Sequence, residues 1–109
     1  MPYDQDLARR IRKEMGNLSG LTEKEMFGGV GFLLNGNMAC GVHKDKLIVR
    51  VGPANYDKAL AAPVARQFDI TGRPMKGWVM VEAGGFATER ALKDWVRQGI
   101  EFARTLPPK

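Results

Sequence analysis

The sequence has few of the residues that bind metal ions or form disulfides. It contains one cysteine, Cys40, and one histidine, His43. A single cysteine excludes a disulfide within the chain, and these two side chains cannot assemble the usual zinc ligand sets. We therefore expect no structural metal and no bound cofactor.

Long hydrophobic runs are also absent. The longest stretch without a charge, residues 26–43, is interrupted by five glycines and two asparagines, which indicates strands and turns rather than a membrane span. The N-terminus has neither the basic nor the apolar segment of a secretory signal. We expect a cytoplasmic protein without membrane association.

What the sequence does contain suits one globular domain spanning residues 1–109. Hydrophobic residues make up 44% of the chain and charged residues 27%, a balance that supports a packed core. Lys and Arg outnumber Asp and Glu by 17 to 12, giving a net charge of +5. This basic excess favours contact with nucleic acid or other polyanions without requiring it.

Helical spacing of apolar residues predicts a helix at each end of the chain. The first spans residues 4–15, and the last runs from Thr88, its expected cap, to about Thr105. Proline suits a first helical turn and stops a helix from within, so a short middle helix is expected between Pro53 and Pro63.

Between Thr22 and Val51 the apolar period changes to two, and turn residues divide this segment into four short strands. The pattern predicts an antiparallel meander. Residues 67–71 and 78–81 supply one or two later strands. The expected fold class is therefore α+β, with a two-layer arrangement of an antiparallel sheet and helices.

The loop between the second and third strands decides which side chains share a face. A loop of three residues, Asn35 to Asn37, segregates apolar from polar residues best. A turn of two residues at Lys44-Asp45 then aligns the fourth strand. The predicted core face carries Val30, Phe32, Leu34, Met38, Cys40, Val42, Leu47, Val49 and Val51.

The opposite face of the meander is smooth and half apolar, with Gly31 and Gly41 paired across the hairpin. Glycine inside a strand marks a bulge or the close approach of another backbone. Sheet twist on a solvated face explains the two glycines equally well. The surface suits a partner element or a second copy of the chain. Its candidate contact residues are Gly31, Leu33, Ala39, Gly41 and Ile48.

No motif indicates a reaction. Cys40 and His43 are three residues apart, so on a strand they point to opposite faces. The glycines of residues 28–31 resemble a phosphate loop only superficially, because no Gly-Lys-Ser/Thr follows. The scattered carboxylates have no spacing typical of a shared metal or an acid-base pair. We expect no catalytic residues.

Several segments together resemble the TfoX N-terminal domain family. They are MFGGVGF at 26–32, NGNM at 35–38, CGV at 40–42, LIVRVGP at 47–53, DITGRPMKG at 69–77 and the end of the last helix with its tail at 102–109. The resemblance covers nearly the whole chain and implies a two-layer α+β fold. The family takes its name from bacterial regulators of competence for DNA uptake, which act with a transcription factor and carry an additional C-terminal domain. We expect a single-domain member of this family, and its regulatory role is what the resemblance implies.

Three function classes remain. The first is a regulatory protein-interaction module whose partner, as the resemblance implies, belongs to the transcription machinery. The second is a direct but weak nucleic-acid binder, and the third is a small enzyme of unknown chemistry. Besides the glycine face, a candidate basic surface combines Arg50 on the meander with Arg73 and Lys76 in the later loop.

Overall fold

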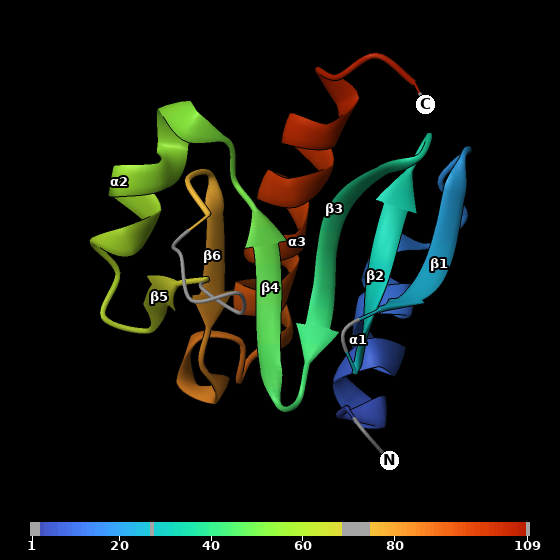
Figure 1. Cartoon of the computed structure of the whole chain (residues 1–109). Coiled ribbons are helices and arrows are strands. Elements are labelled where there is room, and N and C mark those ends of the chain that lie inside the picture. Colours follow the sequence, from blue (N-terminus) through green and yellow to red (C-terminus); the bar gives the residue numbers. More distant parts are fainter. Residues whose placement is uncertain (1–2, 27, 69–74, 109) are drawn as a thin grey trace.

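A computed structural model describes residues 3–26, 28–68 and 75–108 of the chain. Its fold is α+β, as expected: helices pack on an antiparallel sheet of six strands in the order β1-β2-β3-β4-β6-β5 (Figure 1). The elements are α1 (Gln5–Met15), β1 (Leu21–Met26), β2 (Gly29–Leu34), β3 (Asn37–His43), β4 (Lys46–Arg50), the 3₁₀ turn η1 (Pro53–Asn55), α2 (Tyr56–Leu60), β5 (Ala65–Gln67), β6 (Trp78–Val81), the 3₁₀ turn η2 (Ala83–Gly85) and α3 (Glu89–Arg104).

The two long helices have the caps that the sequence predicts. The Asp4 carboxylate accepts hydrogen bonds from the backbone N–H groups of Asp6 and Leu7, and so satisfies donors of the first turn of α1. The Thr88 hydroxyl accepts from the Ala91 N–H at 3.1 Å and starts α3. Both helix boundaries are thus confirmed to within a residue or two.

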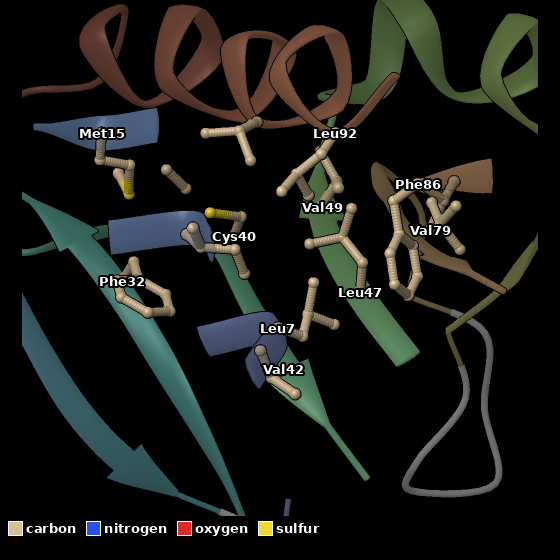
Figure 2. Packing of buried hydrophobic residues seen from close by; sticks show 14 of the residues in the cluster. Leu7, Met15, Phe32, Cys40, Val42, Leu47, Val49, Val79, Phe86 and Leu92 are labelled. Carbon is tan, nitrogen blue, oxygen red and sulfur yellow. The ribbon is translucent and has the colours of Figure 1, made fainter. Parts of the chain in front are cut away.

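Both long helices cover the same side of the sheet, which we call the inner face; the opposite side is the outer face. In Figure 1, α1 and α3 lie behind the strands, while α2 lies beside β5 and β6. Figure 2 shows Cys40 among Phe32, Val49 and Leu92, between the sheet and α3. The inner face therefore carries the main hydrophobic core.

The turn between β2 and β3 differs from the prediction of a three-residue loop. Leu34 pairs with Asn37, so only Asn35 and Gly36 form the turn, both with positive φ (52° and 85°). This is the backbone that a two-residue hairpin needs and that Asn-Gly favours. The register then shifts between Phe32 and Leu33, which leaves one extra residue in β3 as a β-bulge.

The bulge corrects two predicted positions and preserves the rest. Met38 pairs with Leu33 on the outer face instead of joining the core, and Ala39 is fully buried instead of lying on the outer face. Beyond the bulge Phe32 pairs with Cys40, and Gly31 pairs with Gly41, as predicted. The turn is one residue shorter than predicted, and the bulge adds one residue to β3. The predicted three-residue loop and the observed turn with its bulge therefore give the same pairing beyond the bulge.

The hairpin turn also places one polar side chain in the interior. Asn37 shares the inner side with its buried partner Leu34 and is 2% exposed. Its Nδ2 donates to the backbone carbonyl of Pro107 at 2.9 Å, beyond the end of α3. The hydrogen bond offsets the cost of burying the amide and ties the C-terminal residues to the sheet.

Where β3 bulges, it separates from β4. Their ladder runs from the His43–Lys46 pair only as far as Cys40 and Val49, and Figure 1 shows the strands diverging beyond that point. Helix α3 approaches the bulge at Gly99, where any Cβ would collide with the backbone oxygen of Ala39. A glycine is therefore required at this crossing of helix and strand.

Candidate interaction surface

The outer face of the sheet is defined by the register of the strands. Phe32, Cys40 and Val49 point into the core, so their neighbours along each strand point outward, except Ala39 at the bulge. One row of outward positions crosses the sheet from edge to edge through directly paired residues: Lys24, Gly31, Gly41, Ile48, Met80 and Arg66.

The glycine pair in this row is packed more tightly than the sequence suggests. A Cβ at Gly41 would lie 2.5 Å from the backbone oxygen of Val30 and 2.8 Å from Cε of Met38. Both Gly31 and Gly41 are buried. Met38, placed outward by the bulge, thus occupies part of the hollow that the sequence left open above the glycines.

The remaining predicted contact residues differ in how accessible their side chains are. Ile48 lies on the outer face but is only 2% exposed, so its side chain offers almost no area for contact with a partner. Ala39 belongs to the inner core and is excluded from any contact. Leu33 stays half-buried and accessible. Met38, Met80 and Trp78 are also half-buried and provide apolar area that sequence reasoning had assigned elsewhere or not at all.

Arg50 is held by aromatic rings at one end of the sheet. Its guanidinium carbon lies 5.1 Å from the centre of the Trp78 ring and 5.3 Å from that of Phe102 on α3. Trp78 also packs against Phe68, with ring centroids 6.3 Å apart. Cation–π contacts of this kind stabilise a fixed side-chain position, so Arg50 has a structural role here.

The structure brings two members of the predicted basic surface to the same end of the sheet. Arg50 pairs with Trp78, and the carbonyl of Gly77 accepts the N–H groups of Val51 and Gly52, which places the exposed Lys76 close by along the chain. Arg73 lies outside the described residues. The contact of Phe102 with Arg50 could not be predicted, because it depends on the separation of β3 from β4.

Charge is segregated between the two faces of the strands. Outward strand positions carry Lys24, Lys46, Arg50 and Arg66, whereas the strand carboxylates Glu23 and Glu25 belong to the inner side.

On that inner side the carboxylates have partners from the N-terminal region. Arg12 on α1 donates to both oxygens of Glu23, at 2.8 and 2.9 Å, and this hydrogen bonding raises the pKa of Arg12. The hydroxyl of Tyr3 donates to Glu25. These contacts anchor the edge strand β1 to the layer of helices.

Two carboxylates adjoin the basic outer face, and each lies beside a Lys or Arg side chain. Asp45, in the turn before β4, accepts a hydrogen bond from Lys46 at 3.0 Å, which lowers the pKa of Asp45. Glu82, just after β6, lies 3.6 Å from Arg66. The rim of the outer face therefore stays predominantly basic, with Lys24 exposed at one edge.

The surface between the helices differs in its charge. Two hollows there are lined by both signs: Arg9, Arg10, Lys13, Arg90, Lys93 and Arg97 alternate with Glu14, Glu89 and Asp94. The side chain of Arg10 makes hydrogen bonds within the protein: it donates to the carboxylate of Glu89 and to the backbone carbonyl of Phe86. This mixture gives a weaker attraction for any one ligand charge than a face of one sign.

Two candidates for chemistry can be placed among the described residues: the single thiol and the groups of possible metal ligands. Cys40 is fully buried, and burial raises the pKa of its thiol from 9.0 to about 12, so it is not a nucleophile near neutral pH. No group of three or more His, Cys, Asp or Glu side chains is placed to hold a metal ion in this part of the chain. None of the described helices has the length and apolarity needed to cross a membrane.

Two long helices on one side of a six-stranded antiparallel sheet define the class of small two-layer α+β domains. Within that class, the model of the TfoX N-terminal domain matches residues 13–103, and the chain belongs to this family. Comparison with curated proteins and with solved structures gave no match. The resemblance seen in the sequence is thus confirmed at the level of the family.

Proposed function

We propose that this protein is a non-catalytic regulatory module that binds another protein through the outer face of its sheet. Family membership supports a regulatory role, and the resemblance to competence regulators makes a component of the transcription machinery the proposed partner. The observation that carries the proposal is the one-sided packing of the sheet.

Packing on one side leaves accessible apolar area on the other. Helices α1 and α3 cover the inner face, whereas Leu33, Met38 and Met80 remain half-buried on the outer face. Exposed apolar surface with a polar rim is typical of protein contacts. An enzyme would instead need reactive side chains in a cleft, and the one thiol is enclosed in the core.

A weak nucleic-acid binder is the second candidate, favoured by the Lys and Arg side chains that line the hollows between α1 and α3. Carboxylates lie among those basic side chains, so we expect such binding to be nonspecific. It would complement the protein contact on the other side of the molecule rather than replace it.

Site-specific photo-crosslinking tests the proposed function. A photoreactive phenylalanine derivative is placed at Leu33 on the outer face or, as the control, at the exposed Lys93 on α3. Each form is irradiated in a nuclease-treated lysate of the organism that encodes the chain. We expect one protein to crosslink at position 33 and not at position 93. Equal products at both positions, or no protein product at position 33, would contradict the proposal.

A further inference from the structure

We propose that the outer face recognises an acidic amphipathic segment of a protein, one in which carboxylates flank a strip of apolar side chains. This inference rests on the proposed function and specifies the chemistry of the partner. It follows from the charge and the apolar centre of the same face.

The sign of the charge on the rim is the first argument. Lys24 lies on β1 at one edge of the sheet and Arg66 on β5 at the other, with Lys46 on β4 between them. None of the outward strand positions among the described residues carries a carboxylate. Complementary charge steers association and selects a partner of opposite sign.

The centre of the face is the second argument. Leu33, Met38 and Met80 are half-buried, and unbranched methionines adapt their shape to different apolar partners. Met38 packs over the paired Gly31 and Gly41, so methionine atoms form part of the apolar centre of this face. A ridge of apolar side chains fits this centre while its flanking carboxylates reach the basic rim.

The same features weigh against two other occupants. A second copy apposed through this face would bring basic rims together, and like charges repel. Single-stranded nucleic acid is bound on sheets through exposed aromatic platforms. On the central strands β2, β3 and β4 the one outward ring is His43 at the end of β3, and Trp78 packs against Arg50 and Phe68, so successive bases have no row of rings to stack on.

The test uses two pairs of charge reversals in the full chain. The outer-face variant is K24E with K46E, and the matched control is K13E with K93E on the two long helices. Both pairs change the net charge equally, so any difference reflects location. Thermal melting of each variant establishes that it remains folded before binding is measured.

The probes are a synthetic helical peptide with a leucine strip flanked by glutamates, the same peptide with glutamines in place of the glutamates, and a single-stranded oligothymidylate. Binding is followed by NMR chemical shifts of the protein amides. We expect the glutamate peptide to shift amides around Lys24, Leu33 and Met80 selectively. Two lost ion pairs at roughly 0.2–1 kcal/mol each predict a roughly two- to thirtyfold weaker affinity for the outer-face variant. The control variant should bind as the parent does.

Several results would overturn the inference. They are equal weakening by both charge-reversal pairs, equal binding of the glutamine peptide, absence of peptide shifts on the outer face, tighter binding of the oligothymidylate there, or self-association through that face. If Leu33 crosslinks a protein while the glutamate peptide does not bind the outer face, the proposed function stands and the acidic class of partner is rejected. If Leu33 crosslinks no protein, the proposed function itself fails.

Discussion

Burial determines what single residues of this chain can do, and Cys40 is the clearest case. A cysteine thiol can act as a nucleophile where it is accessible and can lose its proton. Its inward position on β3 was predictable from strand alternation, and the structure places it fully inside the core. Arg50 is a second case, since its contacts with Trp78 and Phe102 make this member of the predicted basic surface part of the packing.

The raised pKa of Cys40 makes a prediction about stability at high pH. The folded state holds the thiol proton up to a pKa of about 12, whereas the unfolded chain releases it near the ordinary value of 9.0. The unfolded state therefore gains stability as the pH rises between these values, at up to about 1.4 kcal/mol per pH unit.

Denaturant unfolding of the parent and of Cys40→Ala, measured from neutral to alkaline pH, checks this. We expect the stability advantage of the parent to be constant below the thiol pKa of 9.0 and to shrink above it. An advantage that stays constant throughout would indicate an accessible thiol. Rapid reaction of the folded protein with a thiol reagent would indicate the same.

Neighbouring residues on β2 should differ sharply in their contribution to stability. Phe32 is fully buried on the inner face, and Leu33 is half-buried on the outer face. We expect Phe32→Ala to lower the free energy of unfolding by about 3–5 kcal/mol and Leu33→Ala to lower it much less. Equal losses in urea unfolding would mean that the outer face is covered as fully as the inner one.

At the scale of elements, strand β3 combines what the sequence could and could not predict. Apolar periodicity located all four meander strands, and cap residues located α1 and α3. The bulge at Ala39 was missed because a three-residue loop and a two-residue turn followed by a bulge give identical pairing for Phe32 and Gly31. Only Met38 and Ala39 distinguish the two alternatives, and a methionine or an alanine suits either face.

The crossing of α3 and β3 gives a prediction at this scale. Gly→Ala in a helix normally stabilises by roughly 0.5–1 kcal/mol. At Gly99 a Cβ would collide with the backbone oxygen of Ala39, so we expect Gly99→Ala to lower the melting temperature instead. Gly84→Ala is the control, because the nearest atom to its added Cβ lies 3.9 Å away. A Gly99→Ala variant as stable as the parent would show that α3 shifts freely over the bulge.

The whole molecule has two different sides, and the sequence indicated this only in part. It predicted that one face of the meander is core and the other contains Gly31, Leu33, Ala39, Gly41 and Ile48, of which Ala39 lies in the core instead. It could not indicate how deeply Ile48 is buried or that the outward strand charges are basic across the sheet. Those properties depend on pairing between strands distant in sequence, such as β4 with β6.

The distribution of charge over the whole molecule predicts weak binding of duplex DNA. Lys and Arg side chains occur on both the helical side and the sheet side of the molecule. Between α1 and α3, carboxylates lie beside these basic side chains. We expect dissociation constants of about 10⁻⁴ to 10⁻⁶ M near physiological salt, with steep salt dependence and no sequence preference. Fluorescence anisotropy over a range of salt concentrations measures this. Tight, sequence-selective binding would favour the nucleic-acid function over the protein-interaction function.

We propose that the outer face of the sheet contacts its protein partner through the basic rim, and an affinity comparison tests this contact. The protein crosslinked through position 33 is purified, and its dissociation constant is measured with the parent, with K24E/K46E and with K13E/K93E. We expect weaker binding by the outer-face variant alone. Parental affinity in that variant, or equal loss in both variants, would contradict it.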